Sequence, residues 1–134
     1  MIDALVQVSF TVLDLLSRSA AELDLSVTQL RLIGILRDRS PSMAALADHL
    51  GLDRSSVSGL IDRAERRGLV ARRTSADDAR VTLIDLTPAG REVGQQLGAS
   101  VSARIEKLLQ AVAPAERTGF VQMAESILGT AIRG

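Results

Sequence analysis

The chain has 134 residues, a formal net charge of zero at pH 7, no cysteine and only 1% aromatic residues. This length suits one domain or one elongated subunit. The absence of Trp and Tyr argues against a protein that binds single strands by stacking bases on aromatic rings, and the lack of Cys excludes disulfides and thiolate metal sites within this chain. A neutral chain can still bind nucleic acid, since the placement of charge matters more than its sum.

The first stretch, residues 2–23, has helical periodicity, with apolar side chains near one side. Asp3 precedes its apolar run and no basic segment does, so the stretch fits neither a signal peptide nor a membrane-spanning helix. We therefore expect a soluble, cytoplasmic protein.

Two short helices are predicted next. Ser26 and Gln29 have the spacing of a capping box, which predicts a helix over 28–38. The stretch "RSPS" ends it, and Ser42 can cap a further helix over 43–51. The side chains that we expect these helices to bury are Leu30, Ile33, Leu36, Ala44, Leu46, Ala47 and Leu50.

A helix–turn–helix follows from the next residues. Gly51 supplies a tight turn that tolerates positive φ, Asp53 can cap the next helix, and Gly68 can end it. The inward stripe of this helix consists of Val57, Leu60, Ile61 and Ala64. The outward face carries Ser55, Ser56, Ser58, Gly59, Asp62, Arg63 and Arg66.

The spacing of apolar residues then changes from the helical period to the alternation typical of strands. "LVARRT" and "VTLIDLT", joined by "SADDAR", predict a β-hairpin. Thr87 with Pro88 begins a long helix that runs to about Val112, and Pro114 begins the last helix. The fold class is thus mainly α with a small β-hairpin wing: a winged helix–turn–helix lobe over 26–90, with helical dimerisation segments over 1–25 and 91–134.

The outward face of the second helix of the helix–turn–helix suits a DNA groove. Ser55, Ser56 and Ser58 are small enough to let the helix approach base edges and can donate or accept hydrogen bonds. Arg54 and Arg63 border them and can hold phosphates or reach guanine. The alternative is that the three serines are merely solvated helix surface.

Charge is concentrated just beyond this face. Five arginines and one glutamate between Arg63 and Arg73 give that segment a net charge of +4, and we expect Arg72 and Arg73 to contact DNA. The run can also simply complement a helix C-terminus. At the hairpin tip, Arg80 is a candidate for insertion into the minor groove. We expect Asp78 to pair with a nearby arginine and stiffen the wing, although Asp78 and Arg80 can also form only a turn salt bridge.

These pieces resemble the MarR family of transcription regulators. The resemblance is carried by "LADHLGLDRSSVSGLIDRAERRGLV" and by "DDARVTLIDLTPAG". The second matches the family's wing signature through Asp78, Arg80, Leu86, Thr87 and Gly90. The resemblance implies a homodimeric regulator of a pseudopalindromic operator, usually a repressor, and many members release DNA when a small ligand binds. Gly59 departs from the larger or basic residue that many relatives carry.

Self-association is also expected from the terminal helices, because their apolar faces would leave a large exposed patch on a monomer. The candidate dimerisation residues are Leu5, Val8, Val12, Phe120, Met123 and Ile127. One His, no Cys and no phosphate-binding Gly-rich loop make an enzyme improbable, and we expect no catalytic residue, metal or cofactor. The competing hypothesis is a winged-helix dimer that binds protein partners and has weak or lost DNA binding.

Overall fold

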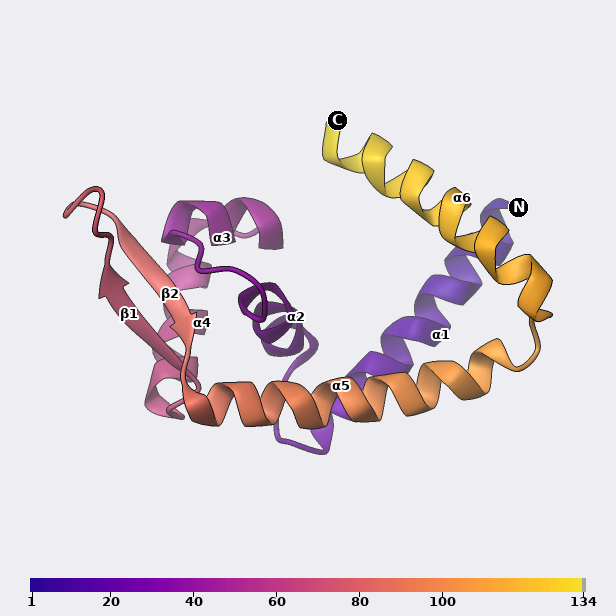
Figure 1. Ribbon diagram of the computed structural model, residues 1–134, viewed down its shortest axis with the longest axis horizontal. Helices are drawn as coiled ribbons and strands as arrows, with labels where there is room; N and C mark the ends of the chain where they lie inside the picture. Colours follow the sequence, from indigo (N-terminus) through magenta and orange to yellow (C-terminus); the bar gives the residue numbers. More distant parts are fainter. Residues whose placement is uncertain (134) are drawn as a thin grey trace. The chain divides into compact units, whose positions relative to one another are not determined.

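A computed structural model describes residues 1–133 of the chain. In chain order its elements are α1 (Ile2–Ala21), α2 (Val27–Leu36), α3 (Met43–Leu50), α4 (Arg54–Arg66), β1 (Val70–Thr74), β2 (Thr82–Leu86), α5 (Pro88–Leu109) and α6 (Pro114–Arg133) (Figure 1). The fold is mainly α with a hairpin wing, as predicted. The chain folds into two compact units, one over residues 1–102 and one from residue 103 onward.

Helices α2, α3 and α4 start within one residue of the predicted positions, and each has a side chain that accepts a hydrogen bond from its first turn. Ser26 and Gln29 form both bonds of the capping box of α2. Ser42 accepts from the backbone N–H of Ala45 at 3.1 Å. Asp53 accepts from that of Ser56 at 2.7 Å. These caps set the three-helix arrangement that orients α4.

One hydrophobic core fills the space between α2, α3, α4 and the hairpin. The predicted inward stripe of α4 is buried, with Val57 and Ile61 completely inaccessible. From the other elements, Leu32, Leu46 and Ile84 are equally inaccessible. One expected core residue was wrong: Ala44 is exposed. It precedes Leu46 by two positions, about 200° around the helix, so the rotation that buries Leu46 turns Ala44 outward.

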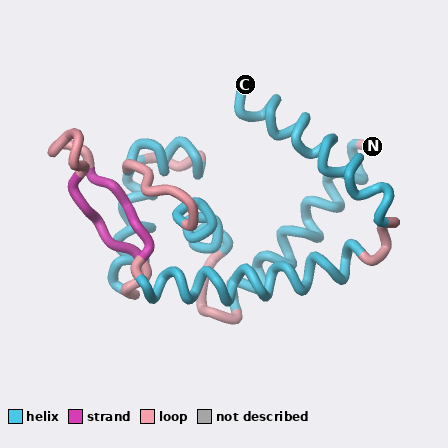
Figure 2. The backbone as a smooth tube through the Cα atoms, viewed as in Figure 1, coloured by secondary structure: helices cyan, strands magenta, loops and turns pink. Residues whose placement is uncertain are grey.

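The wing is a two-stranded antiparallel hairpin, drawn in magenta in Figure 2. Val70 pairs with Leu86 and Thr74 with Thr82 at the two ends of the ladder. β2 also accepts a short partner on its other side, because the N–H of Ile84 donates to the carbonyl of Pro41 at 2.9 Å. The loop between α2 and α3 therefore anchors the wing to the helical core.

The junction from β2 to α5 explains why the wing signature contains Thr87 and Gly90. The Thr87 hydroxyl donates to the carbonyl of Gly68 at 2.5 Å and accepts from the N–H of Gly90 at 3.0 Å. A β-carbon at Gly90 would lie well inside van der Waals contact with the carbonyl oxygen of Leu69. Thr87 and Gly90 thus fix the start of α5 against the end of α4.

Helices α1, α2 and α5 end two or three residues earlier than expected, and α2 stops at Leu36 rather than at residue 38. α1 stops at Ala21 rather than at residue 23, because Asp24 adopts the left-handed conformation (φ 54°) and Leu25 folds back to donate to the carbonyl of Ala20 at 2.9 Å. Leu25 is buried, so this reversal is stabilised by packing. α5 ends at Leu109 rather than at residue 112.

Apolar side chains remain exposed on α1 and on α6. On α1, Leu5 is 53% exposed and Phe10 68%. On α6, Met123 is 62% exposed. In the described part of the chain, no helix combines the length and the apolar character needed to cross a membrane.

Candidate nucleic-acid interface

The outward face of α4 is made of small polar residues and arginines. Arg54, Ser55, Ser56 and Arg63 are exposed, while Ser58 is half-buried. Because the opposite stripe of the same helix is locked into the core, this face cannot rotate inward. α4 therefore presents a polar, donor-rich ridge to its surroundings.

The N-terminal end of that ridge is organised by the capping carboxylate. Asp53 accepts from the hydroxyl of Ser55 at 2.8 Å as well as from the N–H of Ser56. The backbone N–H of Ser56, followed by the hydroxyl of Ser55, holds the pKa of Asp53 below its ordinary value of 3.8. The Ser55 proton is thus directed into the helix cap, and its oxygen lone pairs face outward as acceptors.

Two hollows flank α4 and sort the predicted contact residues into two groups. One, of about 390 Å³, is lined by Ser55, Ser56 and Arg63 together with Ser26 and Thr28 from the start of α2. The other, of about 460 Å³, lies toward the wing and is lined by Arg54, Ser58 and Arg80, among others. The structure thus brings six of the eight predicted DNA-binding residues to the two sides of one helix.

The remaining two, Arg72 and Arg73, lie on β1 and are held in ion pairs. Arg72 contacts Asp62 at 2.6 Å and Glu65 at 2.7 Å, and its side chain is only 30% exposed. Its hydrogen bond to Asp62 raises the pKa of Arg72 above its ordinary value. This double pair joins the wing to the C-terminal half of α4.

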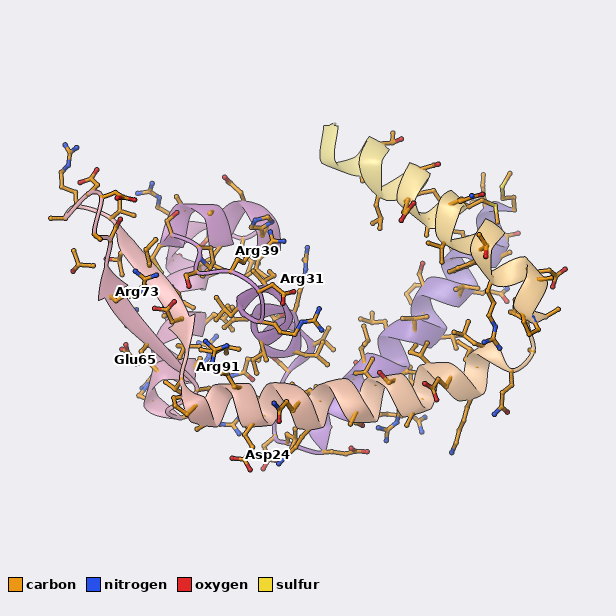
Figure 3. All side chains as sticks on the ribbon, viewed as in Figure 1. Asp24, Arg31, Arg39, Glu65, Arg73 and Arg91 are labelled. Carbon is orange, nitrogen blue, oxygen red and sulfur yellow. The ribbon has the colours of Figure 1, made fainter. Side chains whose placement is uncertain are left out.

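Arg73, which is labelled on the hairpin in Figure 3, pairs with Asp85 of the other strand. Its Nε lies 2.5 Å from Oδ2 of Asp85, and Asp85 also accepts from the hydroxyl of Ser40 in the loop before α3. The Ser40 hydrogen bond, followed by the Arg73 pair, keeps the pKa of Asp85 below its ordinary value. This cluster connects both strands to the helical core.

At the wing tip the expected pairing of Asp78 is present, and its partner is Arg80 itself. Nε of Arg80 lies 3.1 Å from Oδ1 of Asp78, which also accepts from the Arg80 backbone N–H at 3.0 Å. This side-chain contact lowers the pKa of Asp78. The pair is the turn salt bridge that the sequence left open as the alternative. The Arg80 side chain is 90% exposed, so its guanidinium stays accessible.

Sequence reasoning missed the acidic partners that the fold brings to the arginine-rich segment. The charge of +4 over residues 63–73 counts Glu65 but leaves out Asp62 and Asp85, both of which pair with arginines of the segment. The pair between Arg73 and Asp85 could have been predicted from the hairpin register, because the two residues occupy diagonal positions on one face of the hairpin. The spacing of Asp62 and Glu65 gives no comparable indication.

Arg66 and Arg67, which belong to the same segment, make contacts with backbone carbonyls. Arg66 donates to the carbonyl of Asp62 at 3.3 Å, within its own helix. Arg67 donates to the carbonyls of Asp24 at 2.7 Å and Leu23 at 3.0 Å, so it stabilises the chain reversal after α1. These two side chains accordingly have structural partners.

Comparison with known proteins agrees with this architecture. A sequence model of the MarR family matches residues 23–81, from just before α2 to the wing tip. The uncharacterized HTH-type transcriptional regulator YfiV of Bacillus subtilis (strain 168) is 27% identical over 112 residues, which are 83% of this chain and 69% of that protein. A MarR-family transcriptional regulator from Silicibacter pomeroyi has a TM-score of 0.77 at 25% identity, over 92% of this chain and 84% of that one. The transcriptional repressor CouR, bound to a 23-mer DNA duplex, has a TM-score of 0.81 at 24% identity, over 93% and 89% respectively. The chain thus matches the MarR-family model over residues 23–81 and shares the winged helix–turn–helix fold of MarR-family transcriptional regulators.

Proposed function

We propose that this protein is a repressor that binds a pseudopalindromic operator in double-stranded DNA as a homodimer. α4 enters the major groove, with its three serines (Ser55, Ser56 and Ser58) and with Arg54 and Arg63 toward the bases and phosphates. The wing places Arg80 at the adjacent minor groove. The observation that carries the proposal is the outward polar face of α4, held in place by a fully buried stripe.

The availability of charge supports this proposal. Within residues 1–133, the guanidinium groups of Arg54 and Arg63 have no hydrogen bond or ion pair, so both can bind an anionic ligand. Each neutralised phosphate releases counterions and makes binding weaken with salt. Among the relatives, the CouR structure contains a DNA duplex, which supports the same use of this fold here.

Dimerisation supplies the second half of the recognition surface. We propose that residues 1–25 and 91–134 form the dimer contact and that residues 26–90 form the DNA-binding lobe. Leu5 and Val8 are 53% and 47% exposed on α1, and Val12 is half-buried. Phe120 and Ile127 are 54% and 53% exposed on α6. Covering these side chains with a second copy removes apolar area from water, and twofold symmetry separates two recognition helices by about 34 Å, one DNA turn.

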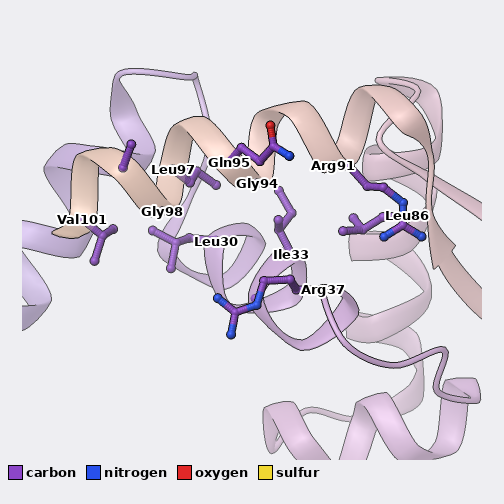
Figure 4. Close-up of a pocket in the computed structure, with 12 residues that line it drawn as sticks. Leu30, Ile33, Arg37, Leu86, Arg91, Gly94, Gln95, Leu97, Gly98 and Val101 are labelled. Carbon is purple, nitrogen blue, oxygen red and sulfur yellow. The ribbon is translucent and has the colours of Figure 1, made fainter.

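A cavity in the first unit supports control by a small molecule. It has a volume of about 540 Å³ and lies between α2 and α5, and the residues that line it include Leu30, Leu97 and Val101 (Figure 4). Arg37 and Arg91 also line it. An apolar body with an anionic group would match this lining. We propose that such an effector binds here and releases the DNA.

Selection of bound duplexes from a random pool tests the DNA-binding proposal. The expected result is a pseudopalindrome with half-site centres one turn apart, and its affinity should fall steeply as salt increases. Enrichment of no sequence at any salt concentration would refute the proposal.

A separate experiment tests the effector site. Adding benzoate as an effector probe to the protein–operator complex should release the DNA, and Arg91→Ala should reduce that release.

Sedimentation tests the dimer independently of DNA. A dimer is expected at micromolar concentration, and Leu5→Asp combined with Ile127→Asp should shift the chain to a monomer with an intact lobe. A stable wild-type monomer at that concentration would rule out the symmetric operator.

A further inference from the structure

Gly59 and Arg63 form one arrangement on the outward face of α4. Side chains of a helix lean toward its N-terminus, so a residue lies over the position four places before it. A β-carbon added at Gly59 would lie 3.3 Å from Nη1 of Arg63, closer than an ordinary van der Waals contact. The guanidinium of Arg63 therefore lies across Gly59, in space that a side chain at position 59 would otherwise occupy.

This placement brings Arg63 one turn closer to the start of α4 than its position in the chain suggests. Its guanidinium borders the same hollow as Ser55 and Ser56. In a helix–turn–helix, the N-terminal half of the recognition helix approaches the base edges. Arg63 thus reaches the part of the helix that enters a groove most deeply.

The other arginines nearby are less suited to reading a base. Arg66, Arg67, Arg72 and Arg73 have partners within the protein. Arg54 has none, but it lines the opposite hollow, together with Arg80 of the wing. On the side of α4 that carries Ser55 and Ser56, Arg63 is the arginine whose donors are available.

We infer that Arg63, laid across Gly59, reads a guanine in the major groove, and that the missing side chain at position 59 determines this specificity. The inference rests on the proposed DNA binding. The planar fork of a guanidinium matches the O6 and N7 acceptors of guanine with two parallel hydrogen bonds. A larger residue at position 59 would fill the space over the helix and divert Arg63 outward to the phosphates.

The test compares four proteins on the selected duplex: wild type, Arg63→Lys, Gly59→Leu and Arg66→Lys. Lysine keeps the charge but lacks the planar fork. Arg66→Lys is the matched control, because it makes the same chemical change on the same face at a residue bonded to its own helix. Leucine favours helix over glycine, so Gly59→Leu should fold at least as well as wild type. Each guanine of a half-site is replaced in turn by 7-deazaguanine, which lacks the N7 acceptor, and affinities are measured by fluorescence anisotropy.

The expected result is one guanine per half-site whose replacement weakens wild type and Arg66→Lys about tenfold, the scale of a bidentate base contact. Arg63→Lys and Gly59→Leu should be affected less than about twofold by the same replacement. If Arg63→Lys keeps the wild-type dependence on that guanine, Arg63 is a phosphate contact and the inference is overturned. If wild type enriches no duplex at all, the proposed function fails, and the inference fails with it. This outcome differs from the one in which wild type binds DNA and Arg63→Lys keeps the wild-type base preference.

Discussion

The arginines of α4 and those of β1 lie within twenty residues of each other, and the fold uses them differently. Arg54 and Arg63, on the helix, have no partner in the described chain. Arg72 and Arg73, on the strand, are paired with Asp62, Glu65 and Asp85. The helix thus keeps its positive charge available, whereas the strand uses its charge to fix the wing. The number of arginines in a segment therefore overstates the charge available to bind phosphate.

This comparison assigns separate roles to the two regions. An available arginine on α4 should affect DNA affinity and leave stability unchanged. A paired arginine on β1 should affect stability, and it should influence DNA binding only through the position of the wing. Substitutions in the two regions should therefore give opposite patterns of change.

The largest effect is expected at Ser55. Ser55→Glu places a carboxylate where α4 meets the groove, so phosphate repulsion should abolish detectable operator binding while the circular dichroism spectrum stays unchanged. Ser55→Ala is the control: it removes one hydrogen bond to Asp53 and keeps the one from the N–H of Ser56. Binding of Ser55→Glu at the wild-type level would mean that another surface faces the DNA.

Arg54→Ala should give the next largest effect. Operator affinity should fall roughly tenfold, and the slope of log affinity against log salt should become shallower by about one counterion. The melting temperature should not change, because this side chain has no internal partner in the described residues. A lower melting temperature with unchanged affinity would reverse the assignment of α4.

Arg72→Ala should show the opposite pattern. Loss of two partly exposed ion pairs should lower the free energy of unfolding by about 1 kcal/mol, which corresponds to a few degrees in melting temperature. The salt slope should remain that of wild type. A shallower slope with no change in stability would show that Arg72 contacts phosphate directly.

The smallest effect is expected from Asp85→Asn, and it depends on pH. The pKa of Asp85 is lowered in the folded chain, so its charge stabilises the fold above the ordinary value of 3.8 and ceases to do so as pH falls through the folded pKa. Near neutral pH the substitution should lower the free energy of unfolding by about 0.5 kcal/mol. Chemical unfolding at a series of pH values should show this difference shrinking below about pH 4. A difference that grows toward acid would contradict the role of the charged form.

Much of the fold could be predicted because its local signals agree with one another. Ser26, Ser42 and Asp53 cap the predicted helices, and Gly51 and Gly68 adopt the positive φ expected of them. The end of α1 could not be placed as well, because Asp24 takes a left-handed conformation that is usually found in glycine.

The candidate site was predictable in its residue types but not in its partners. The outward position of Ser55 follows from helical periodicity alone. The pairing of Arg72 with Asp62 depends on how the wing folds back on α4, which no local spacing specifies. The placement of the Arg63 guanidinium over Gly59 depends on the side-chain conformation in the folded helix, since in the sequence Gly59 stands out only as a departure from the larger or basic residue of many relatives.

Gel shifts with duplex DNA from upstream of this protein's own gene, repeated over a range of salt concentrations, test the central claim most directly. The account predicts a discrete shifted complex whose affinity falls steeply and linearly on a log–log plot as salt increases. Absence of a complex at every salt concentration, with the dimer intact, would contradict it and favour a winged-helix dimer that binds protein partners.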